Sequence, residues 1–425
     1  MQEDFLHYVW QHKKMTLKSL KTTTKEPINL KAVGLPNLNS GPDFFNALLT
    51  IDTQLWAGNV EIHVKSSDWY VHNHETDAAY DNVILHVVWD HNIEVFRKDN
   101  TPIPTLELKH FILPHTLRNY KALIHEKKKW IPCEDSITTV DAFTINHWME
   151  RLYLERLEAK YLGVESQLSD SKYNWEAVLF WQLAKSFGLK VNGEAFLNIS
   201  KSIDFSVIQK VKHDPHSLEA LLLGQSGLLE TTAEHTYVSE LKRVYAFLKN
   251  KFSLPTKGVF PVRFFRLRPP NFPTIRLAQL ANLYSRHSNL FSKIIEARTL
   301  EELHAIFEGP TSEFWKTHYT FEKTSKPVTK SLTRPFINLL IINSIVPLKF
   351  AFNKINRQSQ LEDVIAVVQK IPMEQNSVVN RFHLLYKFRK TALDSQALIQ
   401  LKSNYCSKNK CLHCAIGSAL LNRNS

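Results

Sequence analysis

The stretch from Phe44 to Lys65 constrains the fold more than any other part of the chain, because its side chains alternate with the period of a β-strand. Residues 60–65 read Val-Glu-Ile-His-Val-Lys, so the three apolar side chains share one face and Glu61, His63 and Lys65 share the other. The pattern predicts two neighbouring strands, 44–52 and 60–65, joined by a short hairpin. One face of this pair is apolar and the other can carry chemistry.

Two carboxylates mark the ends of these strands. Asp43 ends the turn sequence Ser40-Gly-Pro-Asp, and Glu61 follows it by 18 residues on the second strand. Neighbouring strands bring such side chains together, and paired carboxylates bind Mg²⁺ or Mn²⁺. A bound ion of this kind polarises a phosphate and generates hydroxide from water. We therefore predict a divalent-metal site at Asp43 and Glu61, which the Ile62 carbonyl can complete.

Other polar residues can assist such a site. His63 or Lys65 lies on the same strand face as Glu61 and can orient the attacking water or stabilise the phosphate. Glu3 and His7, one turn apart on a predicted first helix, can add an outer contact. The alternative is a Pro-Asp turn before an ordinary amphipathic strand with a polar outer face.

A second group of histidines follows directly. His72 and His74 share one face if their segment is extended, and with His63 and Asp77 they can form a zinc site of the hydrolase kind. They can equally serve as a general base or hold the scissile phosphate, or be exposed loop residues. We interpret His86, which lies inside an apolar strand, as a satisfied sheet residue.

The chain changes character after about residue 115, where strand patterns give way to helical ones. The expected elements of the first part are a helix at 3–14, strands at 28–34, 44–52 and 60–65, a loop or short helix at 66–81, a strand at 83–89, and further strands at 94–98 and 105–111. The expected organisation is an α/β domain at 1–115, a basic linker at 116–140, a helical domain at 141–400 and a Cys-rich segment at 401–425. The fold class is α+β.

Charge divides the chain in the same way. Residues 1–134 hold 15 Lys and Arg against 16 Asp and Glu, and 10 of the 19 histidines, whereas residues 135–425 hold 38 against 25. The first part is therefore suited to hold a catalytic site, and the second is suited to bind a polyanion such as nucleic acid. The candidate nucleic-acid contacts mix with phenylalanines in a Pro-rich loop and are Arg263, Arg266, Arg268 and Arg276. A solvated basic surface and a packed loop are the alternatives.

The four cysteines form a third pattern. Cys406, Cys411 and Cys414 lie within nine residues, and Cys133 stands alone upstream. The spacing of the three suits an S₄ site for zinc or an iron–sulfur cluster, with Cys133 as the fourth ligand. The alternative is unligated thiols in a terminal segment. So few cysteines do not make a secreted disulfide framework, so we expect a reducing, cytoplasmic location.

Several classes of protein are not indicated. The N-terminal residues read as a helix start and not as a signal peptide. Polar residues interrupt the longest apolar run, 336–352, which we interpret as a buried helix, and we expect no membrane partner. The chain has neither a Walker-type phosphate loop nor a GxGxxG pattern, which argues against ATP- and dinucleotide-dependent enzymes.

Two resemblances add to these patterns. Over nearly its full length the chain resembles an uncharacterised bacterial family, a domain of unknown function. The segments that carry this resemblance are Glu3–His7, Asn39–Phe44, Gly58–His63, Ser66–Trp69, Tyr80–His86, Arg268–Pro273 and Cys411–Cys414.

Residues 1–112 resemble the PD-(D/E)xK nuclease superfamily, through Pro42-Asp43 and then Glu61-x-His63. This resemblance implies a restriction-endonuclease-like αβββαβ domain and metal-dependent catalysis by Asp43 and Glu61. The chain departs from the pattern at His63, where the superfamily has lysine, and Lys65 lies two residues further on. The cysteine layout is similar in part to that of iron–sulfur-stapled recombination nucleases, although Cys133 follows the core motif.

Together these observations predict a metal-dependent nuclease that acts on DNA or structured nucleic acid. One alternative is a nucleic-acid-binding protein with a degenerate, non-catalytic nuclease core. Another is a zinc-type hydrolase that uses His63, His72 and His74.

Overall fold

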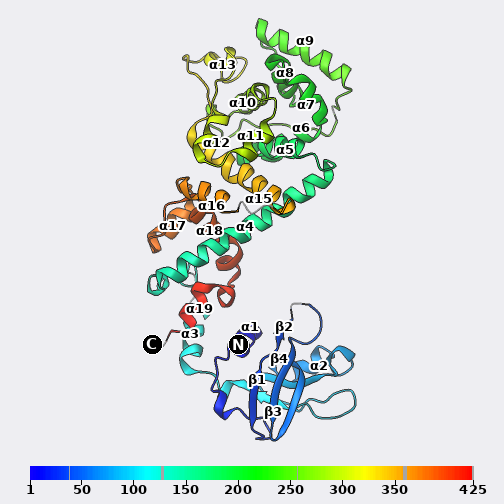
Figure 1. Cartoon of the computed structure of the whole chain (residues 1–425), viewed down its shortest axis with the longest axis vertical. Coiled ribbons are helices and arrows are strands. Elements are labelled where there is room, and N and C mark those ends of the chain that lie inside the picture. The colour runs from blue at the N-terminus through cyan, green and yellow to red at the C-terminus, as the bar shows by residue number, and fades with distance from the viewer. Residues whose placement is uncertain (38, 126–128, 256, 358–360, 424–425) are drawn as a thin grey trace. The chain divides into compact units, whose positions relative to one another are not determined.

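The computed structural model describes residues 1–37, 39–125, 129–255, 257–357 and 361–423 (Figure 1). The chain divides into two units. The sheet unit comprises residues 1–148, 381–387 and 399–425, and the helical unit comprises residues 149–380 and 388–398. The C-terminal segment therefore folds with the N-terminal part, and the boundary between the units differs from the linker expected at 116–140. Residues 126–128 of that linker lie outside the described residues.

A mixed β-sheet forms the centre of the sheet unit. Its strands are β1 (Ile28–Ala32), β2 (Leu35–Pro36), β3 (Phe44–Ile51), β4 (Gln54–Lys65), β5 (Val83–Asp90) and β6 (Thr105–Glu107). The order is β1-β3-β4-β5-β6, and β2 pairs with β3. Pairing is antiparallel from β1 to β4 and parallel from β4 to β6. The α+β class is thus confirmed: a mixed sheet comes first and a largely helical region follows.

The β3–β4 hairpin sets the register of the polar residues. Ile51 pairs with Gln54 across a tight turn, and Phe44 pairs with Val60 beyond a bulge. This register brings the residue before Phe44 next to the residue after Val60. Gly58 is required where β4 meets β5, because a Cβ there would lie 2.4 Å from Ile84 Cγ2.

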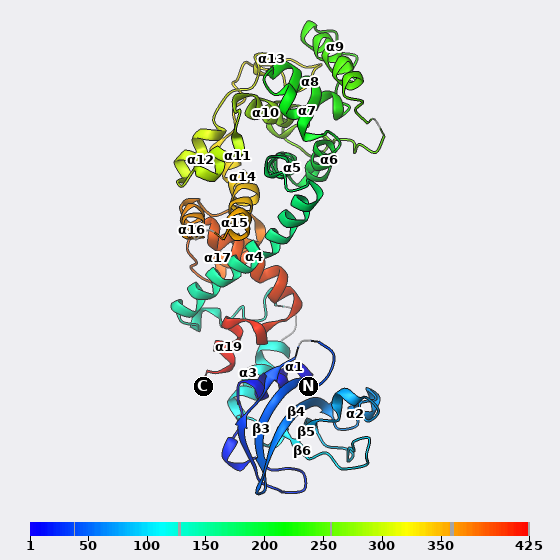
Figure 2. The same cartoon turned by 45° about the vertical axis from the view of Figure 1, so that its right-hand side comes forward.

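Helices cover the sheet and tie in both ends of the chain. Helix α1 (Glu3–Gln11) buries Phe5, which stacks on Tyr120 of α3 (Pro114–His125) with ring centroids 3.9 Å apart. In Figure 2, α1 and α3 lie together beside the sheet, away from α2 (Asp68–Val71). Helix α19 (Ala415–Leu421) joins them, since the Asn119 amide donates to the Leu420 carbonyl at 3.2 Å. Helix α1 is shorter than the predicted 3–14 because Lys13 adopts a left-handed conformation.

The predicted strand at 94–98 is wrong. That segment contains a single bridge, Phe96 to Pro102, and β6 pairs in parallel with β5 and not in a hairpin. The Ser66 hydroxyl accepts the Ile93 N–H at 3.0 Å and donates to the Ile93 carbonyl at 2.7 Å, so a side chain takes the place of a ladder partner. Beyond β6 the chain turns into a 3₁₀ helix, η3 (Leu108–His110), where a strand to residue 111 was predicted.

Helices joined by loops make up most of the rest of the chain. Those from the unit boundary onward are α4 (Ala142–Asp170), α5 (Trp175–Phe187), α6 (Leu189–Lys201), α7 (Phe205–Val211), α8 (Pro215–Gln225), α9 (Thr236–Lys251), α10 (Pro273–Arg286), α11 (Leu290–Glu296), α12 (Leu300–Phe307), α13 (Phe314–Thr317), α14 (Arg334–Leu340), α15 (Val346–Ile355), α16 (Leu361–Lys370), α17 (Ser377–Leu385) and α18 (Ala392–Gln400). A π-helical turn, η6 (Ile341–Ile345), joins α14 to α15.

The stretch from Arg334 to Ile355 is long and apolar enough to cross a membrane, and it is the one such helix among the described residues. However, 72% of its apolar window is buried inside the structure. The stretch therefore packs as a core helix of the helical unit, as its interrupting polar residues predicted.

The β3–β4 hairpin offers a matched test of this packing. Leu49 is fully buried, whereas Leu55, on the adjoining strand, is 55% exposed. We expect Leu49→Ala to lower the free energy of unfolding by about 2–5 kcal/mol, because it leaves a cavity. Leu55→Ala should change it by less than about 0.5 kcal/mol. Urea unfolding followed by circular dichroism measures both, and equal effects of the two substitutions would contradict the described register.

Candidate functional site

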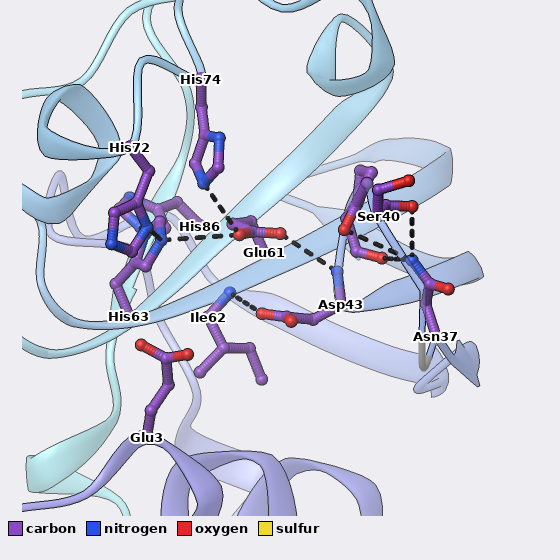
Figure 3. Close-up of polar contacts among 12 residues, drawn as sticks. Glu3, Asn37, Ser40, Asp43, Glu61, Ile62, His63, His72, His74 and His86 are labelled. Atoms are coloured by element: carbon purple, nitrogen blue, oxygen red, sulfur yellow. Dashed lines mark hydrogen bonds and ion pairs between the residues drawn. The ribbon is translucent and has the colours of Figure 1, made fainter.

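The two predicted carboxylates meet at the adjoining ends of β3 and β4 (Figure 3). The Asp43 N–H donates to Glu61 Oε2 at 3.1 Å, and the Ile62 N–H donates to Asp43 Oδ2 at 2.9 Å. These two bonds follow directly from the pairing of Phe44 with Val60. The structure thus brings Asp43 and Glu61 together as the sequence pattern predicted.

A turn organised by one amide holds Asp43 in place. The Asn37 N–H donates to the Asp43 carbonyl at 2.7 Å, and Asn37 Nδ2 lies 3.1–3.3 Å from four carbonyl oxygens of the same turn. Those oxygens belong to residues 39–42. Sequence reasoning missed Asn37, although an asparagine before a Gly-Pro turn is typical of side-chain capping of backbone groups.

Three imidazoles face Glu61 from the opposite side. His63, His72 and His74 each offer a ring nitrogen, and these nitrogens all lie within 4.8 Å of one another. His63 Nε2 is 3.1 Å from His72 Nδ1, and Glu61 Oε1 lies 3.3 Å from His74 Nε2. His63 is buried and His72 is exposed, so the cluster reaches from the sheet to the surface.

The local structure of His72 and His74 differs from the extended segment that was considered. His72 ends helix α2, and the His74 N–H donates to the Trp69 carbonyl at 3.1 Å in the turn that follows. The His74 ring stacks on Tyr80 with centroids 3.7 Å apart. A helical turn, and not a strand face, therefore brings the two histidines to His63.

His86 belongs to the cluster as a supporting residue. It is fully buried on β5, pairs in register with Glu61, and places its Nε2 2.9 Å from His63 Nδ1. If His63 donates from Nδ1 to His86, then Nε2 of His63 presents its lone pair to the other imidazoles and to Glu61. His86 is thus a buried sheet residue, as interpreted. The sequence did not indicate that its hydrogen-bond partner, His63, belongs to the site.

Helix α1 adds two further groups. His7 Nε2 lies 3.2 Å from Asp43 Oδ2 and 4.0 Å from Glu3 Oε1. Both residues were predicted as outer contacts, and the structure places them there. The site therefore combines carboxylates from α1, the β3 turn and β4 with imidazoles from α1, β4, β5 and the turn that ends α2 and follows it.

Burial disfavours charge on both kinds of group. Desolvation, with the nearby charge of Asp43, raises the pKa of Glu61 from 4.5 to about 9. Desolvation and the neighbouring imidazoles lower the pKa of His63 to about 3, and burial also lowers the pKa of His74. Burial opposes protonation of His7 too, but its contact with Asp43 raises its pKa overall.

These groups fit a divalent cation. Neutral imidazoles are metal ligands, and a cation compensates the carboxylates that burial otherwise keeps protonated. The Nε2 atoms of His7 and His74 are buried and lack a hydrogen bond within the described part of the chain, although each lies beside a carboxylate oxygen. A mixed set of imidazole and carboxylate donors favours Mn²⁺ or Zn²⁺ over Mg²⁺.

Two predicted residues lie outside the cluster. The Lys65 side chain is exposed, and only its N–H has a described polar partner, Asp68 Oδ2 at 2.9 Å. Asp77 is exposed and caps the short helix η2 (Ala78–Tyr80) by accepting the Ala79 N–H. In this structure neither side chain contacts Glu61 or the three imidazoles, as far as the described residues show.

The predicted arginines divide into two groups. Arg263, Arg266 and Arg268 are exposed in the loop before the helical turn η5 (Pro269–Asn271). Arg276 is only 6% exposed, donates to Gln279 at 2.8 Å and lies over the Phe336 ring. Burial in the helical core therefore separates Arg276 from the exposed arginines with which it was predicted to contact nucleic acid.

The four cysteines all lie in the sheet unit. They form no disulfide and no cluster of three or more sulfur atoms as close as the imidazole nitrogens, all four cysteines being among the described residues. The S₄ site for zinc or an iron–sulfur cluster that the spacing predicted is therefore not present as a close group of sulfur atoms in this structure. All four do, however, line one small pocket.

Comparison with known proteins identifies the family of the chain. Residues 3–377 match the family described as "Protein of unknown function (DUF2851)", and the chain belongs to this family. The match confirms the resemblance to a family of unknown function. No curated protein and no solved structure matches the chain.

The imidazole cluster predicts a measurable metal affinity. We expect His74→Ala to weaken Mn²⁺ binding by at least about tenfold, because one nitrogen ligand is lost from a preformed set. Isothermal titration calorimetry with Mn²⁺ measures the change. The matched control is His110→Ala, a substitution at an exposed histidine of the same unit. Equal affinities of the two variants would rule out the imidazole site.

Glu61 predicts a pH dependence of stability in the metal-free protein. Its folded-state pKa is raised from 4.5 to about 9, so between these values the folded protein keeps a proton that the unfolded chain loses. Stability of the wild type therefore falls as pH rises through this window, and Glu61→Gln abolishes that fall. We expect the variant to be more stable by about 1–3 kcal/mol at pH 8, with no gain near pH 4.

Urea unfolding in EDTA across this pH range measures the difference between variant and wild type. Glu94→Gln, at an exposed glutamate of the same unit, is the control. Parallel stability curves for Glu61→Gln and wild type would show that Glu61 is charged in the folded state.

Proposed function

We propose that this member of the DUF2851 family is a metal-dependent hydrolase that cleaves phosphodiester bonds in DNA or structured nucleic acid. The observation that carries the proposal is the Asp43–Glu61 pair, held across two strand ends and faced by the three imidazoles. Strand order supports it, because three antiparallel strands followed by parallel ones, with the acidic pair on the second and third, suit the predicted restriction-endonuclease-like fold.

Asp43 and Glu61 would hold the ion, with His63 and His74 as further ligands. When bound, a divalent ion polarises the phosphate and lowers the pKa of a coordinated water. Asp43 is oriented for this by the Ile62 N–H, which occupies one of its oxygens and leaves the other available. Glu61 presents Oε2 toward Asp43 and Oε1 toward the imidazoles, so it joins the two halves of the site.

The imidazoles would accept the proton of the attacking water and transfer it to solvent. The water oxygen would form a new bond to phosphorus while the bond to the leaving oxygen breaks. The water proton would pass to a histidine, and the leaving oxygen would take up a proton from solvent. His72 suits this role because it is exposed and lies 3.1 Å from His63, so the proton can continue to solvent. His86 would position His63 through the bond between their ring nitrogens.

The substrate class follows from charge. Residues 135–425 carry 38 Lys and Arg against 25 Asp and Glu, and the exposed Arg266 lies 5.0 Å from the centroid of the exposed Phe265 ring. Cations beside aromatic rings suit phosphates and unstacked bases. Arg263 and Arg268 extend the same exposed loop.

A zinc-type hydrolase is a second candidate. The observation that favours it is the triad itself, because three histidines with one open position are a common catalytic zinc set. In that case the imidazoles hold the ion, and Glu61, 3.3 Å from His74, acts as general base. The two candidates differ in their dependence on Asp43, which lies outside the triad.

Cleavage of labelled linear, circular and single-stranded DNA and RNA tests the proposal. We expect cutting with Mn²⁺ or Mg²⁺, loss of cutting in EDTA, and a decrease of at least about 100-fold in Asp43→Asn and Glu61→Gln. The control is Asp52→Asn, the same chemical change at an exposed position in the β3–β4 turn, where Asp52 has a left-handed backbone that asparagine tolerates.

The remaining outcomes separate the alternatives. Cutting that survives Asp43→Asn but not His74→Ala would favour the zinc-type hydrolase. Nucleic-acid binding without cutting in any metal would identify a non-catalytic binding protein with a degenerate core and overturn the proposed activity.

A further inference from the structure

The four cysteines of the chain come together although the sequence separates them widely. Cys133 precedes Cys406 by 273 residues, yet both line the same pocket with Cys411 and Cys414. The chain contains no other cysteine. A pocket that gathers every thiol of a 425-residue chain differs from a chance arrangement of buried cysteines, which act as small apolar residues.

The backbone is shaped around these thiols. Asn409 adopts a left-handed conformation between Cys406 and Cys411, and the Lys410 N–H returns to the Tyr405 carbonyl at 3.0 Å. The Cys414 N–H donates to the Cys411 carbonyl at 3.2 Å, which closes the second turn. Gly417 allows α19 to approach this turn, because a Cβ there would lie 2.1 Å from the Cys411 carbonyl oxygen.

The four cysteines line this pocket from two segments that are distant in the sequence. Cys133, Cys411 and Cys414 are each less than a tenth exposed. The structure thus buries sulfur atoms from two distant segments side by side without joining them in a disulfide.

We propose that Cys133, Cys406, Cys411 and Cys414 bind an iron–sulfur cluster. Four thiolates are the usual ligands of such clusters, and the x₄, x₂ spacing of the last three recurs among them. A single zinc ion with bonds of about 2.3 Å would hold its sulfurs only about 3.8 Å apart. No three of the four sulfurs lie within 4.8 Å of one another, so the pocket suits the larger cofactor, which spreads its ligands further.

The cluster would join two segments of the sheet unit. One is the segment that carries Cys133 and continues into the helical turn η4 (Ile137–Thr139), and the other is the C-terminal segment that ends in α19. Metal binding of this kind contributes directly to folding, because a preformed site is absent from the unfolded chain. The inference is independent of the proposed function, since no cysteine contacts the imidazole and carboxylate cluster among the described residues.

Anaerobic purification of the full-length chain tests this inference. Iron, acid-labile sulfide and zinc are measured per chain, together with visible absorption from sulfur-to-iron charge transfer. We expect about two to four iron atoms, an equal amount of sulfide and little zinc. Cys414→Ser should lower the iron content at least several-fold, whereas Ser407→Ala, at an exposed position in the same turn, should retain it.

A second measurement, thiol alkylation, uses the wild type alone and so does not depend on whether a variant folds. In the loaded wild type, native thiol alkylation should be slow at all four cysteines and become fast after the iron is removed by oxidation and chelation. One zinc per chain would overturn the iron–sulfur assignment. Freshly purified protein with neither metal and with four reactive thiols would overturn the site altogether.

Discussion

The pair of bonds between the ends of β3 and β4 underlies the whole site. Each carboxylate is fixed by a backbone N–H of the other strand: Glu61 by Asp43, and Asp43 by Ile62. Two acidic side chains in one buried place repel each other, and these donors offset part of that repulsion. The register of β3 against β4 determines which backbone N–H groups reach the two carboxylates. A slip of one strand by one residue would therefore place the two carboxylates on opposite faces of the sheet.

Charge balance explains why the proposed chemistry needs a cation. His63 stands where the PD-(D/E)xK sequence pattern has a lysine, and burial favours the neutral form of that imidazole by lowering its pKa. Lys65 is exposed and does not replace the missing charge. A site with Glu3, Asp43 and Glu61 would repel a phosphodiester unless a divalent ion compensates the carboxylates. The neutral histidines are then free to bind that ion or to accept a proton.

Local patterns in the sequence predicted the part of the fold that depends on local structure. The alternation of residues 60–65 and the Pro-Asp turn predicted the hairpin and the pairing of Asp43 with Glu61. The short helix or loop predicted at 66–81 did not by itself specify the contacts of His72 and His74, and those of His86 depend on parallel pairing with β5, which has no short-range signal. The burial of Arg276 on Phe336 and the missing strand at 94–98 depend likewise on distant partners.

The sheet unit is discontinuous in sequence, with the helical unit inserted between residue 148 and residues 381–387 and 399–425. During synthesis the β-strands emerge before the helical unit, but α19, which receives a hydrogen bond from Asn119 of α3, emerges after it. The candidate site therefore completes its supporting structure only after nearly the whole chain has been made. Such long-range closure slows folding and leaves the N-terminal strands exposed to chaperones or to aggregation in the meantime. Removal of α19 would therefore weaken the support that α1 and α3 give to the candidate site.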